Sequence, residues 1–321
     1  MRRPLEKPAW VLLICAAAPL LVGCPSRAVC PETFLPLDEL IAQHNANASA
    51  VPRLWARTKL AVTFTDEKGR THSWGSMLLP PSGTLLLAKG ANRLGPHYFV
   101  LCGRETGVDI FRLGSSPEEG LYYFWVRLGG RGQSWYGRHE FAGAPGVEGL
   151  PIDPNELLAV LGIFELPEDL TKLPAVALRM STDPCAYVVT YIDRQPVTNR
   201  VLFRREVLFR WSRTEPPRPF QVKIFAPDGR QVMTASLKQY QTIDTGDGEG
   251  PKPVMPTDIK IDCVDRAGES GGLRSIHMIL SGMTTAAKGK PDLACLYRAN
   301  LPPGVGEVQV DRHLDVKGGE R

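Results

Sequence analysis

The run Lys59-Leu60-Ala61-Val62-Thr63-Phe64-Thr65 carries a large apolar side chain at every second position. Successive side chains of a strand point to opposite faces, so this period of two places Leu60, Val62 and Phe64 on one apolar face. The segment Asp66-Glu67-Lys68-Gly69 is a turn signal, and a second β-rich run begins after it at Thr71. The stretch therefore predicts an antiparallel hairpin that packs one face against a core.

Short β-rich runs of the same kind continue on both sides of this hairpin, bounded by Gly, Pro and charged turns. We expect about a dozen antiparallel strands in all. The further runs are residues 83–89, 95–101, 108–113, 121–127, 133–141, 175–180, 186–193, 201–213, 220–226, 231–242, 257–264 and 273–282.

Two helices are expected to interrupt the strands. In residues 36–48, the side chains of Leu37, Leu40, Ile41 and His44 recur at helical spacing and share one face. In residues 154–161, the preceding Asp153 is a good N-cap, Pro154 suits the first helical position and Glu156 completes a capping box.

Composition agrees with a globular, turn-rich protein. The chain has 321 residues, of which 43% are hydrophobic and 22% charged, with 31 Gly and 28 Pro. Helices and strands do not alternate, and no composition break divides the chain, so we expect one mainly β (α+β) domain over residues 35–312 and a tail over residues 313–321. A net charge of +4 is too small to indicate a nucleic-acid partner.

The N-terminus predicts export. Arg2, Arg3 and Lys7 precede an apolar run over residues 9–22. As a helix this run would rise about 21 Å, which is shorter than a bilayer core of about 30 Å. A basic start and a short apolar stretch are typical of a signal peptide. An ordinary signal peptide or an uncleaved anchor is the alternative to the more specific interpretation that follows.

The segment Leu21-Val22-Gly23-Cys24 resembles the bacterial lipobox. The resemblance implies that residues 1–23 are removed, that Cys24 receives a diacylglyceryl group and a further acyl chain such as palmitate, and that residues 24–34 form a tether. Because Pro25 rather than Asp follows the cysteine, the resemblance also implies the outer membrane, with the protein on its periplasmic face. The predicted partner of Cys24 is thus a membrane of the cell envelope.

Five further cysteines follow in the mature chain, namely Cys30, Cys102, Cys185, Cys263 and Cys295. An exported protein can keep disulfides, but an odd number allows at most two bridges, and the spacing leaves the pairing open. No Cys-x-x-Cys occurs, which argues against a zinc ribbon or a thioredoxin-type redox site.

The order of these elements resembles the LolA/LolB-like lipoprotein-carrier superfamily. The resemblance is carried by Leu37–Asn47, Leu60–Phe64, residues 75–81, residues 152–158 and the late run Met255-Pro256-Thr257-Asp258-Ile259-Lys260-Ile261. It implies a large curved antiparallel sheet, or half-open β-barrel, with two or more short helices over an apolar concave face. In that superfamily the concave face holds acyl chains of a lipid or a lipoprotein.

If such a cavity exists, the apolar faces of the best-patterned strands should line it. The candidates are Leu60, Val62, Phe64, Tyr123, Trp125, Ile259 and Ile261, with Cys263 in the same row as the two isoleucines. The run Tyr122–Trp125 is bulky on both faces, so an ordinary core strand that is covered on both sides is the favoured interpretation there, with a cavity wall as the alternative.

One catalytic motif is disfavoured by its surroundings, so a hydrolase is only a distant third hypothesis. Residues 268–272 read Gly-Glu-Ser-Gly-Gly, which matches the nucleophile elbow of α/β-hydrolases around Ser270. That motif requires a helix after the serine, whereas Ile276, Met278 and Leu280 predict a strand. We therefore expect no catalytic role for Ser270 and no enzymatic activity.

Cofactor and metal motifs are also lacking. The acidic run over residues 244–250 does not match an EF-hand loop, so an exposed hairpin loop is favoured over a Ca²⁺ site. The six histidines show no metal-ligand spacing and are expected at the surface or at a rim. No phosphate-binding loop and no dinucleotide fingerprint occurs in the sequence, so we expect no cofactor and no metal.

Two functions follow as hypotheses. The first is an envelope lipoprotein that binds an acyl chain, another lipid or a lipoprotein in a half-open barrel. The alternative is a structural or protein-interaction lipoprotein with a filled core, no ligand and a protein partner in the envelope.

Overall fold

The structure is a computed structural model of the chain. It describes residues 30, 34–65, 69–75, 82–91, 96–128, 131–142, 144, 147, 154–194, 200–211, 215–226, 228–246, 252–264, 272–286 and 291–315. The predicted signal peptide, Cys24 and most of the predicted tether lie outside these residues.

One sheet of fifteen strands runs through the described chain. Its strands are β1 (Arg53–Thr65), β2 (Thr71–Trp74), β3 (Ser82–Ala88), β4 (Tyr98–Glu105), β5 (Val108–Ser116), β6 (Leu121–Leu128), β7 (Arg131–Arg138), β8 (Ala175–Thr182), β9 (Cys185–Arg194), β10 (Val201–Arg210), β11 (Arg218–Phe225), β12 (Gln231–Thr242), β13 (Val254–Cys263), β14 (Gly272–Thr284) and β15 (Val305–Gln309). Their order is β15-β7-β6-β5-β4-β3-β1-β14-β13-β12-β11-β10-β9-β8, and β2 pairs with β1 beside this path.

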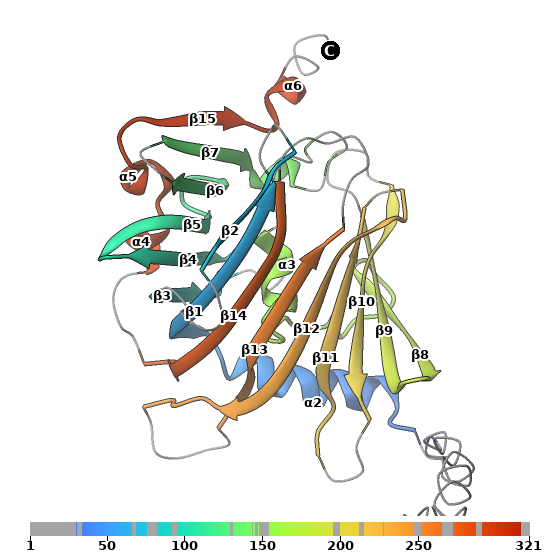
Figure 1. The fold of residues 1–321 in the computed structure, drawn as a ribbon. Coiled ribbons are helices and arrows are strands. Elements are labelled where there is room, and N and C mark those ends of the chain that lie inside the picture. The colour runs from blue at the N-terminus through green and yellow to red at the C-terminus, as the bar shows by residue number, and fades with distance from the viewer. Residues whose placement is uncertain are drawn as a thin grey trace, which may run out of the picture.

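The two halves of the sheet meet in its middle, where β1 pairs with β14 in antiparallel register, Leu60 opposite Met278. The path ends in β15 on one side and β8 on the other, so the sheet is open. Figure 1 shows that it curves strongly and encloses α3 on its concave side. The structure thus confirms the predicted mainly β fold with a large, curved, half-open sheet.

Both predicted helices are present. The first, α2 (Leu37–Ser49), lies across one end of the strands, and the second, α3 (Pro154–Val160), follows a short 3-10 turn, η2 (His139–Phe141), in the connection between β7 and β8. Their limits differ from the predicted ranges by at most one residue. The connection is important for the site, because its residues cover the concave face.

The C-terminal part of the chain was not anticipated. Residues 291–315, here called the C-terminal strap, contain α4 (Pro291–Cys295), α5 (Tyr297–Asn300), β15 and α6 (Arg312–Asp315). β15 pairs with β7 in parallel, which corrects the expectation of antiparallel strands only. These elements span four or five residues each, too few for a periodic pattern to be detected.

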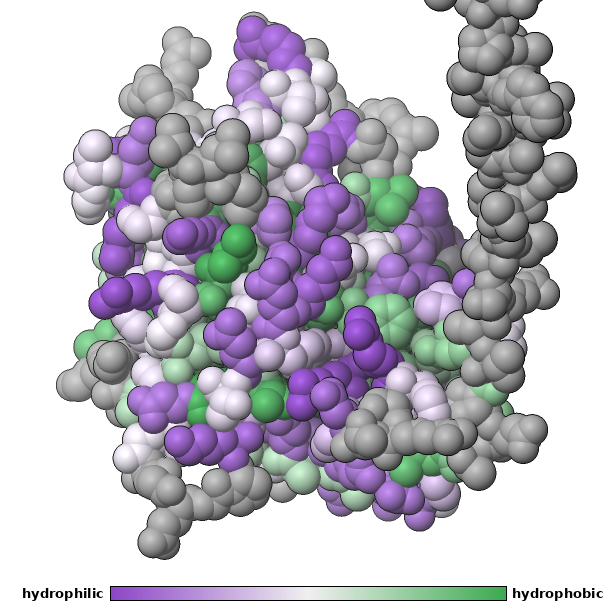
Figure 2. Space-filling model, turned by 60° about the horizontal axis from the view of Figure 1, so that its bottom comes forward, coloured by the Kyte–Doolittle hydropathy of each residue, from purple (hydrophilic) through white to green (hydrophobic). Residues whose placement is uncertain are grey.

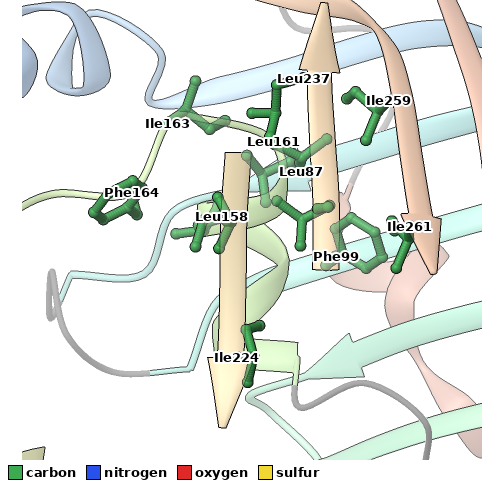
Figure 3. Packing of buried hydrophobic residues seen from close by; sticks show 14 of the residues in the cluster. Leu87, Phe99, Leu158, Leu161, Ile163, Phe164, Ile224, Leu237, Ile259 and Ile261 are labelled. Atoms are coloured by element: carbon green, nitrogen blue, oxygen red, sulfur yellow. The ribbon is translucent and has the colours of Figure 1, made fainter. Parts of the chain in front are cut away.

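The main core fills the space inside the curve (Figure 3). Side chains from both halves of the sheet meet there with side chains from the connection between β7 and β8. The labelled members are Leu87, Phe99, Leu158, Leu161, Ile163, Phe164, Ile224, Leu237, Ile259 and Ile261, all buried. The concave face is therefore apolar, as the strand patterns predicted.

A disulfide joins Cys30 to Cys185, across 155 residues of sequence. It selects one of the pairings that the sequence left open, while Cys102, Cys263 and Cys295 are outside any disulfide in the part of the chain that the structure describes. None of the described helices combines the length and the apolar character needed to cross a bilayer.

Candidate functional site

The concave face is built from two regular cross-strand rows. Leu60 pairs with Met278, which pairs in turn with Ile259. In the adjacent row, Val62 pairs with Ile276 and Ile276 with Ile261. All six side chains are buried in the main core, so four of the seven predicted cavity-lining residues lie together on one apolar surface: Leu60, Val62, Ile259 and Ile261.

Phe64 lies near the end of β1, beyond these rows. It is half-buried, pairs with His72 on β2, and its ring stacks on the His72 ring with centroids 5.4 Å apart. The side chain shares the strand face of Leu60 and Val62 but belongs to the rim of the sheet rather than to the main core.

Tyr123 and Trp125 point to the opposite side of the sheet. Their neighbours on β6, Tyr122 and Phe124, join the main core, whereas Tyr123 and Trp125 form a second buried cluster with Tyr297 of the C-terminal strap. The structure therefore does not bring these two residues to the concave face. β6 is apolar on both faces because the strap covers its outer side, which is the core interpretation given to this run above.

A plug occupies the concave face where a ligand would be expected. We use this name for residues 154–166, which comprise α3 and the residues after it. Leu158, Leu161, Ile163, Phe164 and Leu166 are all at most 5% exposed and pack into the main core. In Figure 3 the first four of them project between side chains of the two halves of the sheet.

Gly162 lets the plug approach the sheet closely. Its backbone has φ of +70°, a left-handed conformation that glycine adopts without strain. A Cβ atom at this position would lie 3.1 Å from a methyl carbon of Leu237 and 3.3 Å from the hydroxyl of Tyr240. The glycine that ends α3 thus turns the chain down onto β12.

Polar side chains of α2 hold the plug in place. The side-chain amide of Asn45 donates to the Leu166 carbonyl over 2.9 Å and accepts from the Leu166 N–H over 2.8 Å. His44 Nε2 donates to the Phe164 carbonyl over 2.8 Å. These three hydrogen bonds, here called the latch, join two segments about 120 residues apart in sequence. They satisfy buried backbone groups of a segment that has no regular structure.

His44 is neutral in this setting. Burial lowers its pKa to about 4, and the nearby positive charges of Lys89 and Arg205 act in the same direction, against the hydrogen bond to Phe164. Its ring also packs on the rings of Phe164 and Phe209, with centroids 4.7 and 5.1 Å apart. His44 and His97 are both buried, so the expectation that every histidine lies at the surface or a rim is wrong for these two.

Lys89 extends the contacts between α2 and the plug. Its ammonium group donates to the Ala48 carbonyl at the end of α2 over 2.6 Å and lies 3.3 Å from a carboxylate oxygen of Glu165. Both charged groups are about nine-tenths buried. A second amide on α2, that of Asn47, bonds the N–H and the carbonyl of Val254 and so attaches the helix to β13.

A buried ion pair fastens the other part of the plug. Arg205 Nη1 lies 2.6 Å from Glu156 Oε2, and both side chains are less than one-tenth exposed. The Arg205 guanidinium stacks over the Tyr191 ring at 4.1 Å and over the Phe164 ring at 5.0 Å. Desolvation raises the pKa of Tyr191 to about 12, so its hydroxyl remains neutral beside the pair.

The sequence contained a partial signal for these contacts. His44 falls on the apolar face of the predicted helix, and this position indicates a buried rather than a surface histidine. Its partner, the carbonyl of Phe164, could not be found from spacing because it is 120 residues away. The amides of Asn45 and Asn47 gave no pattern that distinguishes them from residues that end a helix.

Two further sequence motifs are the serine motif around Ser270 and the acidic run over residues 244–250. Ser270 and most of the acidic run over residues 244–250 lie outside the described residues, but the strand expected after Ser270 is present as β14. Within the described ranges, no group of three or more His, Cys, Asp or Glu side chains is placed to hold a metal ion.

The arrangement defines a class of protein: an open, curved sheet whose apolar concave face is closed by a helix and a latched connecting segment.

No family model and no curated protein matches the chain. Similar solved structures include a DUF1329 family protein from Desulfovibrio piger, 10% identical, which covers 84% of this chain and 100% of its own with a TM-score of 0.48.

Two further solved structures belong to the same comparison. A putative outer membrane lipoprotein-sorting protein domain from Vibrio parahaemolyticus is 10% identical, covers 87% of this chain and 97% of its own, and has a TM-score of 0.44. A LolA superfamily protein from Nitrosomonas europaea is 12% identical, covers 83% and 99%, and has a TM-score of 0.41. The third of these structures is described as a member of the superfamily that the sequence resembles.

Proposed function

We propose that this protein is a lipid-anchored protein of the bacterial cell envelope that binds an acyl chain, of a lipid or of a lipoprotein, on the concave face of its sheet in place of the plug. Cys24 carries the anchor, and the outer membrane is the membrane concerned. The observation that supports binding is the source of the side chains that cover that face. They belong to the plug, a segment outside the sheet that α2 holds by a few directed polar contacts.

The free energy gained by burying the plug is similar to that gained by burying an acyl chain, so one can replace the other. Five large apolar side chains of the plug are buried, and each contributes about 2 kcal/mol, so the plug gains of order 10 kcal/mol from burial. An acyl chain of about 14 CH₂ groups gains a similar amount, at about 0.8 kcal/mol per group. Because these two burial free energies are close, small changes in the latch or the plug decide whether the plug or the acyl chain occupies the concave face.

The test uses the chain from residue 25 onward, which retains Cys30 and therefore the disulfide. A fluorescent fatty acid should bind it, and Leu161→Ala, which removes a plug side chain from the core, should increase the affinity at least several-fold. Leu121→Ala is the matched control, because it deletes an equally large buried side chain from the second cluster on the other side of the sheet. The control should lose stability without a gain in affinity.

The filled core favours the alternative, a structural or protein-interaction lipoprotein whose partner is another envelope protein. Every labelled plug side chain in Figure 3 is buried, as in an ordinary domain core. If neither the parent chain nor Leu161→Ala binds the fatty acid while both remain folded, ligand binding is excluded and the structural function takes its place.

The anchor is tested separately. Cys24→Ser should move the protein from the membrane fraction to the soluble fraction, because two or more acyl chains are needed for stable attachment and the variant has none. A Cys24→Ser protein that stays in the membrane with its first 23 residues attached would show that the apolar run itself is the anchor.

A further inference from the structure

We propose that the Cys30–Cys185 disulfide orients the domain on the membrane, so that the end of the sheet carrying α2 faces the bilayer. The surface concerned consists of α2, residue 34 and the turn between β8 and β9, and its partner is a lipid surface. The inference rests on the proposed acylation of Cys24 and adds to it which side of the domain meets the membrane.

The disulfide attaches the chain to a definite corner of the fold. Cys185 is the first residue of β9 and follows the turn that ends β8. A second contact lies beside it, where the Leu35 N–H donates to the Tyr187 hydroxyl over 2.9 Å. The chain between the anchor and α2 is therefore held at the start of β9 before the helix begins.

Chain length limits how far this corner can be from the lipid. Cys30 is the sixth residue after Cys24, and a fully extended chain of six residues spans at most about 21 Å. Without the disulfide, the first residue of α2 is thirteen residues from Cys24, and the limit rises to about 45 Å. The disulfide thus halves the maximum distance between Cys24 and the folded domain, whatever path the tether takes.

The same end of the sheet carries α2. The start of β9 pairs with the end of β10, where Arg210 is opposite both Ala186 and Arg218, the first residue of β11. At this end Asn47 of α2 binds Val254 at the start of β13. The turn between β11 and β12, at residues 226–230, lies at the other end, about 26 Å away along a strand of eight residues.

The character of this end suits contact with headgroups rather than insertion. Figure 2 shows it as mainly hydrophilic in its middle, with apolar residues scattered between. Phe34, the last residue of the predicted tether, is 55% exposed and provides one apolar side chain for the interface. The latch residues His44 and Asn45 belong to the helix at this end and are buried on its inner side.

The experiment uses the full, acylated chain in membranes of the bacterium that expresses it. A photo-reactive benzoylphenylalanine replaces Asp183 in the β8–β9 turn or, as the matched control, Asp228 in the β11–β12 turn. Both aspartates are exposed and lie in hairpin turns at opposite ends of the strands. After irradiation, crosslinking to phospholipid is measured for each, and again in a Cys30→Ser/Cys185→Ser background.

Crosslinking at position 183 should exceed that at position 228 at least five-fold, and the ratio should fall to below two-fold when the disulfide is removed. Equal crosslinking at the two positions of the disulfide-bonded protein, or a ratio that the double serine variant does not change, would overturn the proposed orientation. Cys24→Ser should abolish lipid crosslinking at both positions. Crosslinking that persists in Cys24→Ser would contradict the acylation instead, and the fatty-acid assay above tests binding without any membrane.

Discussion

The side-chain amide of Asn45 on α2 forms two hydrogen bonds with the backbone of Leu166 in the plug. It donates to the Leu166 carbonyl and accepts from the Leu166 N–H. Leu166 also lies in the main core, nearly without exposure. A single polar side chain on the helix therefore fixes the position at which the apolar plug ends and the surface loop before β8 begins.

Removal of the Asn45 side-chain amide should lower the free energy of unfolding. Asn45→Ala leaves a buried N–H and a buried carbonyl of Leu166 without their partners, and each such loss costs about 1–3 kcal/mol. We expect the free energy of unfolding in urea to fall by about 3 kcal/mol. Gln43→Ala is the control on the same helix, because the Gln43 amide donates to the Glu39 carboxylate at the surface. It should cost less than about 0.5 kcal/mol, and equal losses from both variants would contradict the latch.

Stability should depend on pH through His44. Its pKa is about 4 in the folded protein and 6.5 in the unfolded chain, so the unfolded state binds the proton more tightly. The contribution is fully present above pH 6.5 and is lost as the pH falls from 6.5 to about 4, by up to about 3 kcal/mol. His44→Gln keeps a donor for Phe164 but does not titrate.

Urea unfolding of the parent and of His44→Gln at pH 7.5, 5.5 and 4.5 measures this difference. Because burial also lowers the pKa of His139 to about 4, the comparison between the two proteins, rather than the parent alone, isolates His44. A difference between parent and variant that stays constant over this range would show that His44 does not titrate on unfolding as stated.

The sequence places Leu60 and Val62 on one strand face, and Ile259 and Ile261 on another, because the pleat of a strand directs odd and even positions to opposite faces. Leu60 and Val62 meet Ile259 and Ile261 through Met278 and Ile276 for this reason. The same rule cannot say which face is the core when both are apolar, and Tyr123 and Trp125 show this. Their cover, Tyr297, lies in a four-residue helix that no periodicity reveals.

The burial of the plug on the concave face could not be predicted either. The residues after Asp153 predict a helix, but the depth at which it is buried depends on strand residues 49 to 75 positions away, such as Arg205, which pairs with Glu156, and Leu237, which lies beside Gly162. Long-range polar pairs of this kind have no local signature, because each partner alone looks like a surface residue.

The pair formed by Arg205 and Glu156 should respond asymmetrically to mutation. Glu156→Gln leaves a buried guanidinium without its carboxylate and should cost about 3 kcal/mol of unfolding free energy, whereas Glu156→Gln/Arg205→Met, which removes both charges, should cost less than the single change. Arg179→Met tests an exposed pair with Glu206 and should cost below about 1 kcal/mol. A double variant less stable than Glu156→Gln would mean that Arg205 stabilises mainly through its stacking on Tyr191.

The C-terminal strap should open locally when the side chain of Tyr297, which attaches it to the sheet, is removed. Tyr297 is fully buried, its hydroxyl bonds Ser134 over 2.8 Å and Glu307 over 3.0 Å, and its backbone N–H donates to Glu119. Tyr297→Ala removes an aromatic side chain and should cost about 4 kcal/mol. Because the strap is terminal and β15 is an edge strand, we expect this loss to appear as opening of the strap rather than as global unfolding.

Hydrogen exchange should therefore speed up at least ten-fold at the amides of β15 and α5 in Tyr297→Ala, while the amides of β9 to β13 keep the rates of the parent protein. Leu293→Ala, which truncates an exposed side chain on α4 of the same strap, should change neither group. Exchange that accelerates equally in β15 and in β9 to β13 would show that the strap and the rest of the sheet unfold as one unit, and that Tyr297 supports the whole domain.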